Sequence, residues 1–381
     1  MNSSTVAAQQ QRSFPMPVIG IDARKYFDFG IGTYLQNLVQ HLSQRSLSYT
    51  FLLLVDPADR NHVTVPPGWG CVSISEKKYS LSELFILGLR AQRLGVRLFH
   101  IPHYTLPYGL RIPSLVTVHD LIHLRFPQYF SRMQRLYANT VMRHAVTSAS
   151  GVITDSQFAK QDLLSHFRMD DKRVHAIPLG VSGKFTPASD RNSLDAFRAA
   201  HGLRNPFVLY VGGNSPHKNI ITLLRAFARV AEKRSDMSLV FVGKAPGGHP
   251  DLAGFIERNR LDKKILYLGK LSDADLANVY RSAEMLVLPS LYEGFGFPPL
   301  EAMACGTPSV VSDRGALPEV VGDAALVCPA EDENAFADAM MTIIDRPVER
   351  QELIRRGLAN IKRFSWDETA RKTLEVYEAF I

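Results

Sequence analysis

Residues 285–301 read MLVLPSLYEGFGFPPLE and place a strand-like segment shortly before the start of a helix. The run Met285–Pro289 is short and apolar on both faces, which is typical of a buried parallel strand. Pro298 and Pro299 suit the first turn of a helix, because the N–H groups that they lack would have no partner there. The segment therefore predicts one strand-and-helix unit of a parallel sheet.

The same alternation of apolar runs and helical periodicity extends along the whole chain. After the first run, Leu35, Leu38, Val39 and Leu42 recur at the spacing of one helix face. In the first half we predict strands at Val18–Asp22, Phe51–Val55, Leu98–Ile101, Leu115–His119, Val152–Thr154 and Val174–Ile177. In the second half we predict strands at Phe207–Gly212, Leu239–Gly243, Ile265–Leu268, Met285–Pro289, Ser309–Ser312 and Leu326–Cys328. Each half is thus expected to be an α/β domain with a doubly wound parallel sheet.

The polar, turn-rich segment 182–192 (SGKFTPASDRN) separates the two halves and predicts a linker. A chain of 381 residues is about the right length for two domains. We expect an N-terminal Rossmann-like domain over residues 1–185 and a C-terminal one over residues 193–365. Doubly wound sheets bind ligands beyond the carboxyl ends of their strands, so loops of both domains are expected to line a cleft.

Composition excludes several classes of protein. A hydrophobic content of 46% with 21% charged residues is ordinary for a soluble protein, and no apolar stretch approaches the roughly eighteen residues of a spanning helix. The polar start MNSSTVAAQQQRSFP lacks the apolar core of a secretory signal and predicts a disordered leader. Three widely separated cysteines form no disulfide or metal-ligand pattern. We therefore expect a cytoplasmic protein.

Charge is distributed unevenly along the chain. Residues 1–184 carry 20 Lys and Arg against 11 Asp and Glu, whereas the remainder carries 24 against 26. A basic half suggests an anionic partner, either a membrane surface or a phosphorylated substrate. Nucleic acid is not expected, because no recognised binding module accompanies the charge.

The first candidate site is a short glycine turn, Gly30 and Gly32, expected between the first strand and a helix. Glycines there let backbone N–H groups approach a phosphate that the helix dipole favours. A dehydrogenase is the alternative, since Asp56 ends the second strand where a ribose-binding acid would lie. However, Leu35 occupies the place of the third glycine, and the turn after Asp22 is too long for a dinucleotide fingerprint. Phosphate binding without NAD is preferred.

The second candidate lies between Glu293 and Glu301. Four backbone amides are expected at the positive end of a helix, ready for an anion; they belong to Gly294, Phe295, Gly296 and Phe297. Glu301 lies about one turn inside the helix, where it could reach a ribose, and Glu293 lies just outside, towards the cleft. Two acids that merely complement the helix dipole would not require the Gly-Phe-Gly turn.

The third candidate is the turn 212–219 (GGNSPHKN), again between a strand and a helix, with Gly213 and Asn214 in its first half. Lys218 would neutralise the charge of a leaving diphosphate. A purely solvated lysine is a poor alternative, because a cation at a helix start opposes the dipole.

The fourth candidate is His119, at the carboxyl end of a predicted strand and followed by Asp120. A strand end in a doubly wound domain points towards the ligand cleft. A structural His–Asp contact stays open as the alternative.

The pair Asp273 and Asp275 resembles a D-x-D metal motif, but Ser272 precedes it. Ser272 with Asp275 three residues later predicts a helix N-terminus instead. No other cluster has metal-ligand spacing, and neither a G-x-S-x-G elbow nor a P-loop is present. We expect neither a metal nor a cofactor.

Together these motifs resemble a known family. GIGTY (30–34), TVHD (117–120), VGGNSPHKN (211–219) and LYEGFGFPPLEAMACGTPSVVS (291–312) are similar to the family 4 retaining glycosyltransferases of the GT-B fold, and look closest to bacterial mannosyltransferases. The resemblance covers nearly the whole chain. It implies two Rossmann-like domains that face each other across a cleft, a donor on the C-terminal domain, an acceptor on the N-terminal domain, and a last helix, 366–381, that returns to the N-terminal domain.

The resemblance also implies roles for residues. Glu301 would bind the donor ribose, Glu293 the hydroxyls of the transferred sugar, and His119 would lie beside that sugar. Lys218, Gly32 and the amides of 294–297 would hold the diphosphate, with Gly30, Gly213 and Asn214 in the same turns. The expected catalytic residues are His119, Lys218 and Glu293. Many members carry an arginine shortly before the lysine; here His217 precedes it, which leaves the source of a second positive charge open.

The expected function is that of a retaining glycosyltransferase. It would transfer mannose from GDP-mannose to a glycan or lipid-linked acceptor. The acceptor would bond to the sugar on the face from which the diphosphate leaves. UDP-hexose is the alternative donor. A nucleotide-sugar epimerase, a phosphorylase and a non-catalytic sugar-nucleotide-binding subunit are the alternative classes.

A membrane-bound position on the inner face is a further hypothesis for the stretch 130–148. It carries Arg132, Arg135, Arg143 and His144, with Tyr137 and Met142 at helix-like spacing. A basic amphipathic helix can lie on an anionic bilayer. A solvated helix packed on its own domain is the alternative.

Overall fold

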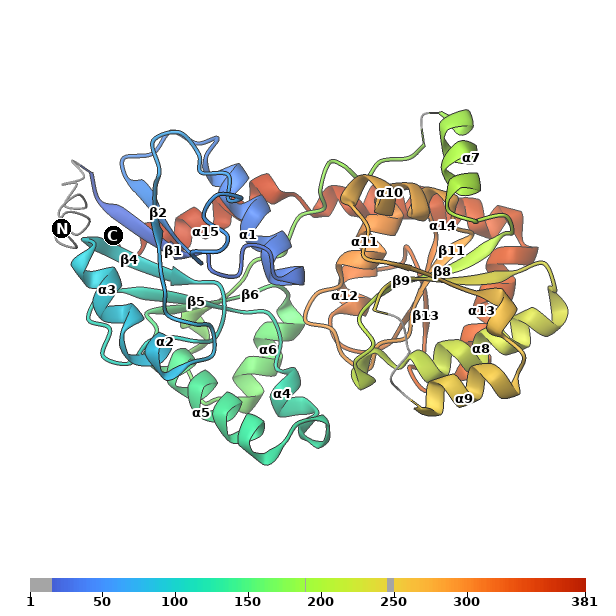
Figure 1. Cartoon of the computed structure of the whole chain (residues 1–381), viewed down its shortest axis with the longest axis horizontal. Coiled ribbons are helices and arrows are strands. Elements are labelled where there is room, and N and C mark those ends of the chain that lie inside the picture. Colours follow the sequence, from blue (N-terminus) through green and yellow to red (C-terminus); the bar gives the residue numbers. More distant parts are fainter. Residues whose placement is uncertain (1–15, 189, 245–249) are drawn as a thin grey trace, which may run out of the picture. The chain divides into compact units, whose positions relative to one another are not determined.

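The computed structural model describes residues 16–188, 190–244 and 250–381. The segment 1–15, for which the sequence predicts a disordered leader, lies outside them. The chain divides into two compact units (Figure 1). The first comprises Met1–Asp155, Ala159–Leu179 and Trp366–Ile381, and the second comprises Ser156–Phe158 and Gly180–Ser365.

The first unit contains a seven-stranded sheet in the order β3-β2-β1-β4-β5-β6-β7, and its strand pairs are parallel. The strand order reverses between β1 and β4, where an open α/β sheet provides a ligand site. The strands are β1 (Val18–Asp22), β2 (Thr50–Val55), β3 (Gly70–Ser73), β4 (Val96–Ile101), β5 (Ser114–Val118), β6 (Gly151–Thr154) and β7 (Val174–Ala176).

Helices cover both faces of this sheet, with α1 and α15 on one face and α2, α3, α5 and α6 on the other (Figure 1). Leu35, Leu38 and Leu42 of α1 are fully buried, as their spacing predicts. The helices are α1 (Phe29–Leu42), α2 (Leu81–Phe85), α3 (Leu87–Arg93), α4 (Ile122–Arg125), α5 (Arg132–Ser148), α6 (Gln157–His166) and α15 (Trp366–Glu378).

The second unit contains a six-stranded parallel sheet in the order β10-β9-β8-β11-β12-β13. Its order reverses between β8 and β11, in the same pattern as the first sheet. The strands are β8 (Phe207–Gly212), β9 (Ser238–Gly243), β10 (Ile265–Gly269), β11 (Met285–Leu288), β12 (Ser309–Ser312) and β13 (Leu326–Cys328).

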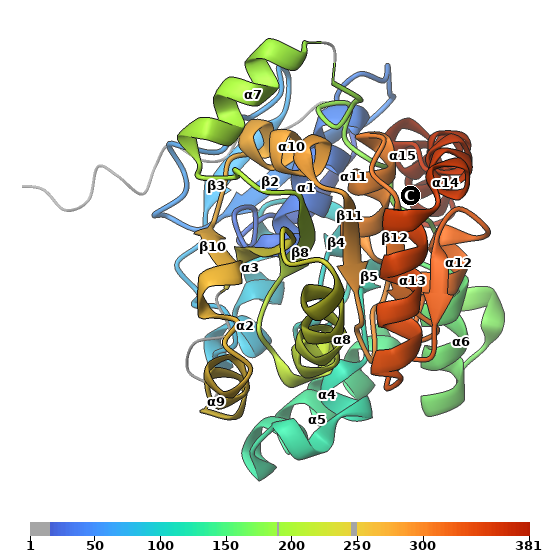
Figure 2. The ribbon, with the colours of Figure 1, turned by 90° about the vertical axis from the view of Figure 1, so that its right-hand side faces the viewer.

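The helices of the second unit also lie on two faces. Helices α8 and α13 pack side by side on one face, and α11 packs on α14 on the other (Figure 2). The helices are α7 (Arg191–Ala200), α8 (Ile220–Lys233), α9 (Pro250–Arg258), α10 (Asp273–Ser282), α11 (Phe297–Ala304), α12 (Leu317–Val321), α13 (Glu333–Asp345) and α14 (Pro347–Asn360).

Every strand predicted from the sequence is present, with ends that differ by at most two residues. The sequence missed β3, a four-residue edge strand that is largely half-exposed and therefore carries no apolar run. The predicted linker 182–192 extends too far, because the carboxylate of Asp190 accepts hydrogen bonds from two backbone N–H groups and starts α7 at Arg191.

Tyr137 and Met142, the apolar residues that the membrane hypothesis names on α5, are not exposed. Met142 is fully buried and Tyr137 is half-buried, so both point towards the unit's interior. The exposed apolar side chains of this helix are instead Met133 and Leu136. A capping box formed by Ser131 and Gln134 starts the helix.

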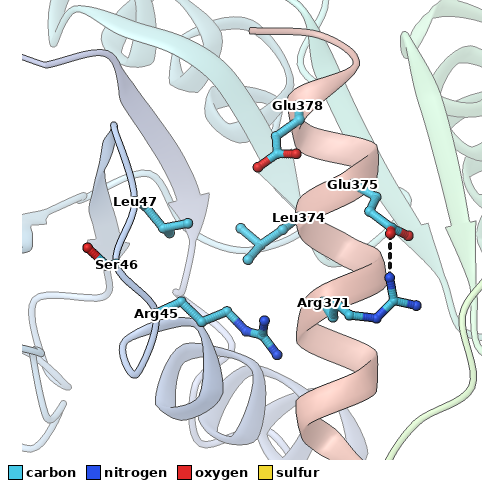
Figure 3. Close-up of a pocket in the computed structure, with 7 residues that line it drawn as sticks. All are labelled: Arg45, Ser46, Leu47, Arg371, Leu374, Glu375 and Glu378. Carbon is cyan, nitrogen blue, oxygen red and sulfur yellow. Dashed lines mark hydrogen bonds and ion pairs between the residues drawn. The ribbon is translucent and has the colours of Figure 1, made fainter.

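Helix α15 belongs to the first unit although it comes from the far end of the chain. Its Tyr377 hydroxyl lies 2.6 Å from Nδ1 of the fully buried His100, whose Nε2 lies 2.8 Å from Thr117 Oγ1. Burial lowers the pKa of His100 to about 3, so the ring is neutral. Beside α15, a pocket is lined by Arg45 and by Glu375, which is paired with Arg371 (Figure 3); its mixed charges favour no particular ligand.

Replacing Tyr377 with Phe removes the partner of a buried imidazole nitrogen, and we expect a loss of about 1–3 kcal/mol in the free energy of unfolding. Urea unfolding of the whole chain measures this loss. Tyr49→Phe is the matched control, since its hydroxyl makes only a 3.5 Å contact with Glu378 on the same helix. Equal losses in the two variants would contradict a special role for the His100–Tyr377 bond.

Candidate active site

An ion pair joins the two loops that follow β8 and β11, the strands on either side of the order reversal of the second sheet. Lys218, in the turn after β8, places its Nζ 2.7 Å from Oε1 and 2.9 Å from Oε2 of Glu293, which follows β11. Ser290 Oγ also donates to Oε1, at 2.7 Å. The two charged side chains are 21% and 15% exposed. Two of the predicted site residues therefore meet where the topology favours a ligand.

The backbone around Lys218 is fixed by Asn219, a residue that the sequence analysis did not single out. Asn219 adopts a left-handed conformation with φ +54°. Its Nδ2 donates to the carbonyl oxygens of Pro289, at 3.0 Å, and Ala330, at 2.7 Å. Lys218 thus ends a 3-10 turn, 216–218, and α8 begins at Ile220, so the lysine lies before the helix. An Asn directly before a helix start was the only signal in the sequence.

His217 does not supply the second positive charge that the sequence left open. Burial lowers its pKa to about 4, and the neighbouring charge of Lys218 adds to that effect. The imidazole is consequently neutral near pH 7, and Lys218 is the charged group of this turn.

The glycine turn after Glu293 has the predicted geometry. Helix α11 begins at Phe297, with two prolines in its first turn and no side-chain cap. Gly296 has φ +122°, and a Cβ there would lie 2.9 Å from a Leu317 methyl carbon. The sequence did not mark Gly315, which has φ +65° and where a Cβ would lie 2.5 Å from the Glu293 nitrogen. These glycines allow the backbone beside the ion pair to pack without side chains.

Glu301 lies in α11, and its Oε2 accepts a 2.7 Å hydrogen bond from the Tyr280 hydroxyl. Burial raises the pKa of Glu301 to about 7, and the charge of Asp273 acts in the same direction, whereas the Tyr280 hydrogen bond opposes the shift. The sequence could not reveal Tyr280 as a partner, because the two residues come from different helices.

Other residues of the candidate turns have structural contacts. The Gly213 carbonyl accepts a 2.7 Å hydrogen bond from the hydroxyl of Tyr210, and Asn214 follows it in the same turn.

Ser272 caps α10 by accepting from the Asp275 N–H, which confirms that the D-x-D sequence is a helix start. Among the residues described, no helix is long and apolar enough to cross a membrane.

Gly30 and Gly32 lie in the first unit, inside the first turn of α1 and not before it, because the helix begins at Phe29. A Cβ at Gly32 would lie 2.6 Å from the Tyr26 carbonyl oxygen, whereas one at Gly30 would meet nothing within 4 Å. Gly32 is therefore required by packing, and the side of Gly30 is open. The carboxylate of Asp28, the residue before the helix, makes no capping bond.

His119 follows β5 in the first unit, and both of its ring nitrogens face acceptors. Nδ1 lies 2.7 Å from Asp155 Oδ2, and Nε2 lies 3.3 Å from the Pro102 carbonyl oxygen. Burial acts to lower its pKa, but the charge and hydrogen bond of Asp155 outweigh burial and raise it. The structural partner is thus Asp155 and not Asp120, whose carboxylate accepts from the Ile122 N–H.

Comparison with known proteins assigns the chain to a family. A family model described as Glycosyltransferase Family 4 matches residues 30–183, and one described as Glycosyl transferases group 1 matches residues 194–359. An O-antigen chain mannosyltransferase B from Escherichia coli is 32% identical over 282 residues, which cover 74% of each chain. The fold and these matches define a glycosyltransferase of the GT-B fold. The chain belongs to glycosyltransferase family 4.

Further similar proteins are named for different activities. An MMP alpha-(1->4)-mannosyltransferase from Mycolicibacterium hassiacum is 32% identical over 299 residues, covering 76% of this chain and 69% of that protein. A D-inositol 3-phosphate glycosyltransferase from Corynebacterium glutamicum is 29% identical over 279 residues, covering 70% and 66%. The solved structure of sucrose-phosphate synthase from Thermosynechococcus elongatus has a TM-score of 0.78 at 23% identity, over 96% of this chain and 98% of that one. The family and the resemblance to bacterial mannosyltransferases are confirmed.

The raised pKa of Glu301 predicts a pH-dependent stability. The folded chain holds this proton up to about pH 7, against a value of 4.5 for an ordinary Glu, so the stabilisation that the proton provides is lost as pH rises from about 4.5 through 7. We expect Glu301→Gln to melt a few degrees above the wild type at about pH 8, and at the same temperature near pH 5.

Thermal melting of the unliganded chain at the two pH values measures this difference. Glu257→Gln, at an exposed position of α9, serves as the control and should follow the wild type. A Glu301→Gln variant that melts below the wild type at both pH values would show that the carboxylate stabilises the fold.

Proposed function

We propose that this glycosyltransferase is a retaining enzyme that transfers mannose from GDP-mannose to a glycan or lipid-linked acceptor without a metal ion. The observation that carries the proposal is the Lys218–Glu293 pair, held at the order reversal of the second sheet beside an uncapped helix start. A cation, an oxygen-rich acid and a row of backbone amides are the groups that a sugar diphosphate requires.

The proposed donor site lies on the second unit. Lys218 and the amides of 294–297 bind the diphosphate, with Gly213 and Asn214 in the turn beside it. Glu301 accepts hydrogen bonds from the ribose, which gives a function to a carboxyl group whose burial is otherwise costly. Glu293 accepts hydrogen bonds from the sugar hydroxyls once the diphosphate has taken Lys218.

The first unit contributes three of the proposed residues. Gly30 leaves room for a phosphate oxygen at the uncapped start of α1. Gly32 allows that turn to close, since a side chain there would strike the Tyr26 carbonyl. His119, oriented by Asp155, lies at a strand end of the first unit, and contact with the sugar is its proposed role.

The proposed chemistry is a same-face substitution. The bond between the anomeric carbon and the diphosphate oxygen breaks, and its electron pair stays on the diphosphate. The acceptor oxygen bonds to the anomeric carbon from the same face, and its proton passes to the leaving phosphate oxygen. Lys218 stabilises the developing negative charge, so no metal ion is needed for that role. A double displacement would need a carboxylate nucleophile beneath the anomeric carbon, whereas the role proposed for Glu293 is to accept hydrogen bonds from the sugar hydroxyls.

GDP-mannose is the proposed donor because two of the similar proteins are mannosyltransferases by name. A UDP-hexose is the second candidate, because the contacts described involve the ribose, diphosphate and sugar and leave the base unspecified. D-inositol 3-phosphate glycosyltransferases also match the chain.

Two substitutions separate the proposed roles of the acids. Glu301→Ala should weaken GDP binding about tenfold or more, because the ribose loses its partner. Glu293→Gln should bind GDP at least as well as the wild type, since Lys218 is released from its ion pair, yet it should lose about a hundredfold in turnover. Isothermal titration with GDP and UDP measures the first effect, and transfer assays in excess EDTA measure the second.

Glu257→Gln, remote from the site, controls for general damage. Loss of nucleotide binding in Glu293→Gln with normal binding in Glu301→Ala would reverse the two roles. Binding of UDP without GDP would replace mannose by a UDP-hexose. Activity that disappears in EDTA and returns with magnesium would refute the metal-free mechanism.

We further propose that the enzyme is cytoplasmic and binds the inner face of the membrane through the first unit. Met133 and Leu136 of α5 are 76% and 64% exposed, and Leu81 of α2 is 74% exposed. The two helices are neighbours, because the Phe85 ring stacks on Tyr108, which stacks on His144 of α5. Exposed arginines on α5 would attract anionic lipid, and the apolar side chains would enter the interface.

Co-sedimentation with vesicles tests the membrane proposal. The wild type should pellet with anionic vesicles at low salt and much less with neutral ones, and the double variant Met133→Ser, Leu136→Ser should stay largely in solution. Val348→Ser removes an even more exposed apolar side chain, from the second unit, and should behave as the wild type. Equal recovery with neutral and anionic lipid would exclude the proposal.

A further inference from the structure

A second group of polar side chains gathers where the strand order of the first sheet reverses. Lys25 lies three residues beyond β1, and His103 lies two residues beyond β4. These two strands flank the reversal, where open α/β sheets bind ligands. Neither residue belongs to the donor site proposed above.

Lys25 is a buried cation without a carboxylate partner among the residues described. It is only 4% exposed, and its Nζ lies 2.5 Å from the Tyr79 hydroxyl and 3.8 Å from the centre of that ring. The three nearby acids are already engaged, because Arg24 binds Asp22 at 2.6 Å and Glu83 at 2.7 Å, and Lys78 binds Asp28 at 2.7 Å. Burial lowers the pKa of Lys25 to about 8. The ammonium group therefore retains hydrogen-bonding capacity that the protein does not use.

Three further polar atoms are buried and have no partner among the residues described: Nδ1 of His103, Nδ1 of His123 and the hydroxyl of Tyr137. The charges of Lys25 and His123 both act on His103, and that of Tyr137 acts on Tyr79, so these groups belong to one cluster. His103 is 8% exposed, and burial holds its pKa well below the ordinary value, so it is neutral. Its ring contacts Tyr79 at 5.6 Å and Tyr104 at 4.0 Å between ring centres. Tyr104 in turn contacts His123 at 6.1 Å. Buried polar groups without partners are rare in native proteins, and several together indicate a ligand.

The backbone of Tyr79 is strained, and this strain also indicates a functional site. Its φ is +60°, an unusual value for an aromatic residue, and the residue is 52% exposed. The strain is maintained by the Tyr79 N–H, which donates to Glu83 Oε2 at 2.5 Å. Strained residues cluster at functional sites because the surrounding structure must hold them there. The Arg24–Glu83 pair thus fixes Tyr79, and Tyr79 positions Lys25.

We propose that Lys25, Tyr79, His103, His123 and Tyr137 bind a neutral sugar ring of the acceptor, with Lys25 and His103 as specificity-determining residues. This inference rests on the proposed transferase function and names the class of its acceptor. An ammonium donor, two neutral imidazoles, a phenol and exposed aromatic faces match the mixed donors, acceptors and C–H surfaces of a carbohydrate.

A phosphate group fits the cluster less well. Phosphate recognition favours the planar fork of arginine or several cations, and Arg24 is already occupied by Asp22 and Glu83. Lys78, the other nearby cation, is paired with Asp28 at 2.7 Å. We therefore infer that the acceptor is not an inositol phosphate, the group after which the similar D-inositol 3-phosphate glycosyltransferases are named.

Saturation-transfer NMR on the whole chain tests the inference. The probes are methyl α-mannoside, a mannobiose and myo-inositol 1-phosphate, and inorganic phosphate, which has no carbon-bound protons, is added as a competitor. The wild type should bind a saccharide probe and neither phosphate. Lys25→Met and His103→Leu should each weaken saccharide binding about tenfold or more, whereas His41→Leu, a half-exposed histidine on α1, should not.

GDP and UDP binding are measured in the same samples, together with the melting temperature. Variants that melt normally and bind nucleotide as the wild type does, yet bind the saccharide less tightly, support the inference. It is overturned if both variants keep full saccharide affinity, if the wild type binds the phosphates in preference, or if it binds no saccharide at millimolar concentration. A wild type that binds neither GDP nor UDP contradicts the proposed function instead.

Discussion

The ion pair between Lys218 and Glu293 is the interaction on which the candidate site depends. It joins the ends of β8 and β11, the two strands on either side of the order reversal in the second sheet. A partly buried charge is costly unless it is paired and hydrogen-bonded, so each side chain keeps the other in place until a ligand replaces it. Ser290 holds the carboxylate, and Asn219 holds the turn that carries the lysine. A diphosphate with a sugar attached could satisfy both charges at once.

Burial of an ionisable group is also costly at Glu301. Its half-buried side chain accepts a hydrogen bond from the Tyr280 hydroxyl, and burial raises the pKa of its carboxyl group. A neutral residue would stabilise the unliganded chain better, and proteins retain such locally unfavourable choices mainly where they function. In the first unit, Lys25 and His103 repeat the pattern, since both are buried polar groups that the protein leaves without full partners. Each unit thus carries ionisable groups away from full solvent at its own order reversal, and only those of the first unit include atoms without a partner among the residues described.

The sequence predicted the parts of this structure that depend on local patterns. Apolar runs predicted the central strands, and Pro298 and Pro299 marked the start of α11, because burial and helix geometry act over a few residues. The contacts that sequence reasoning missed join distant segments. Tyr280 to Glu301, Asp155 to His119, Gly315 to Glu293 and Asn219 to Ala330 arise only when the sheets assemble. The edge strand β3 was missed because it is half-exposed. The burial of Met142 on α5 depends on packing against other elements, which the local pattern does not show.

A crystal structure of the chain with a bound nucleotide sugar would test the central claim most directly. The account predicts that Lys218 Nζ leaves Glu293 and lies within hydrogen-bonding distance of the diphosphate, which also accepts from the amides of residues 294–297. The Glu301 carboxylate should then contact the ribose, and Glu293 should contact the sugar hydroxyls. A nucleotide bound elsewhere, with the Lys218–Glu293 pair intact and Glu301 still bonded only to Tyr280, would contradict it.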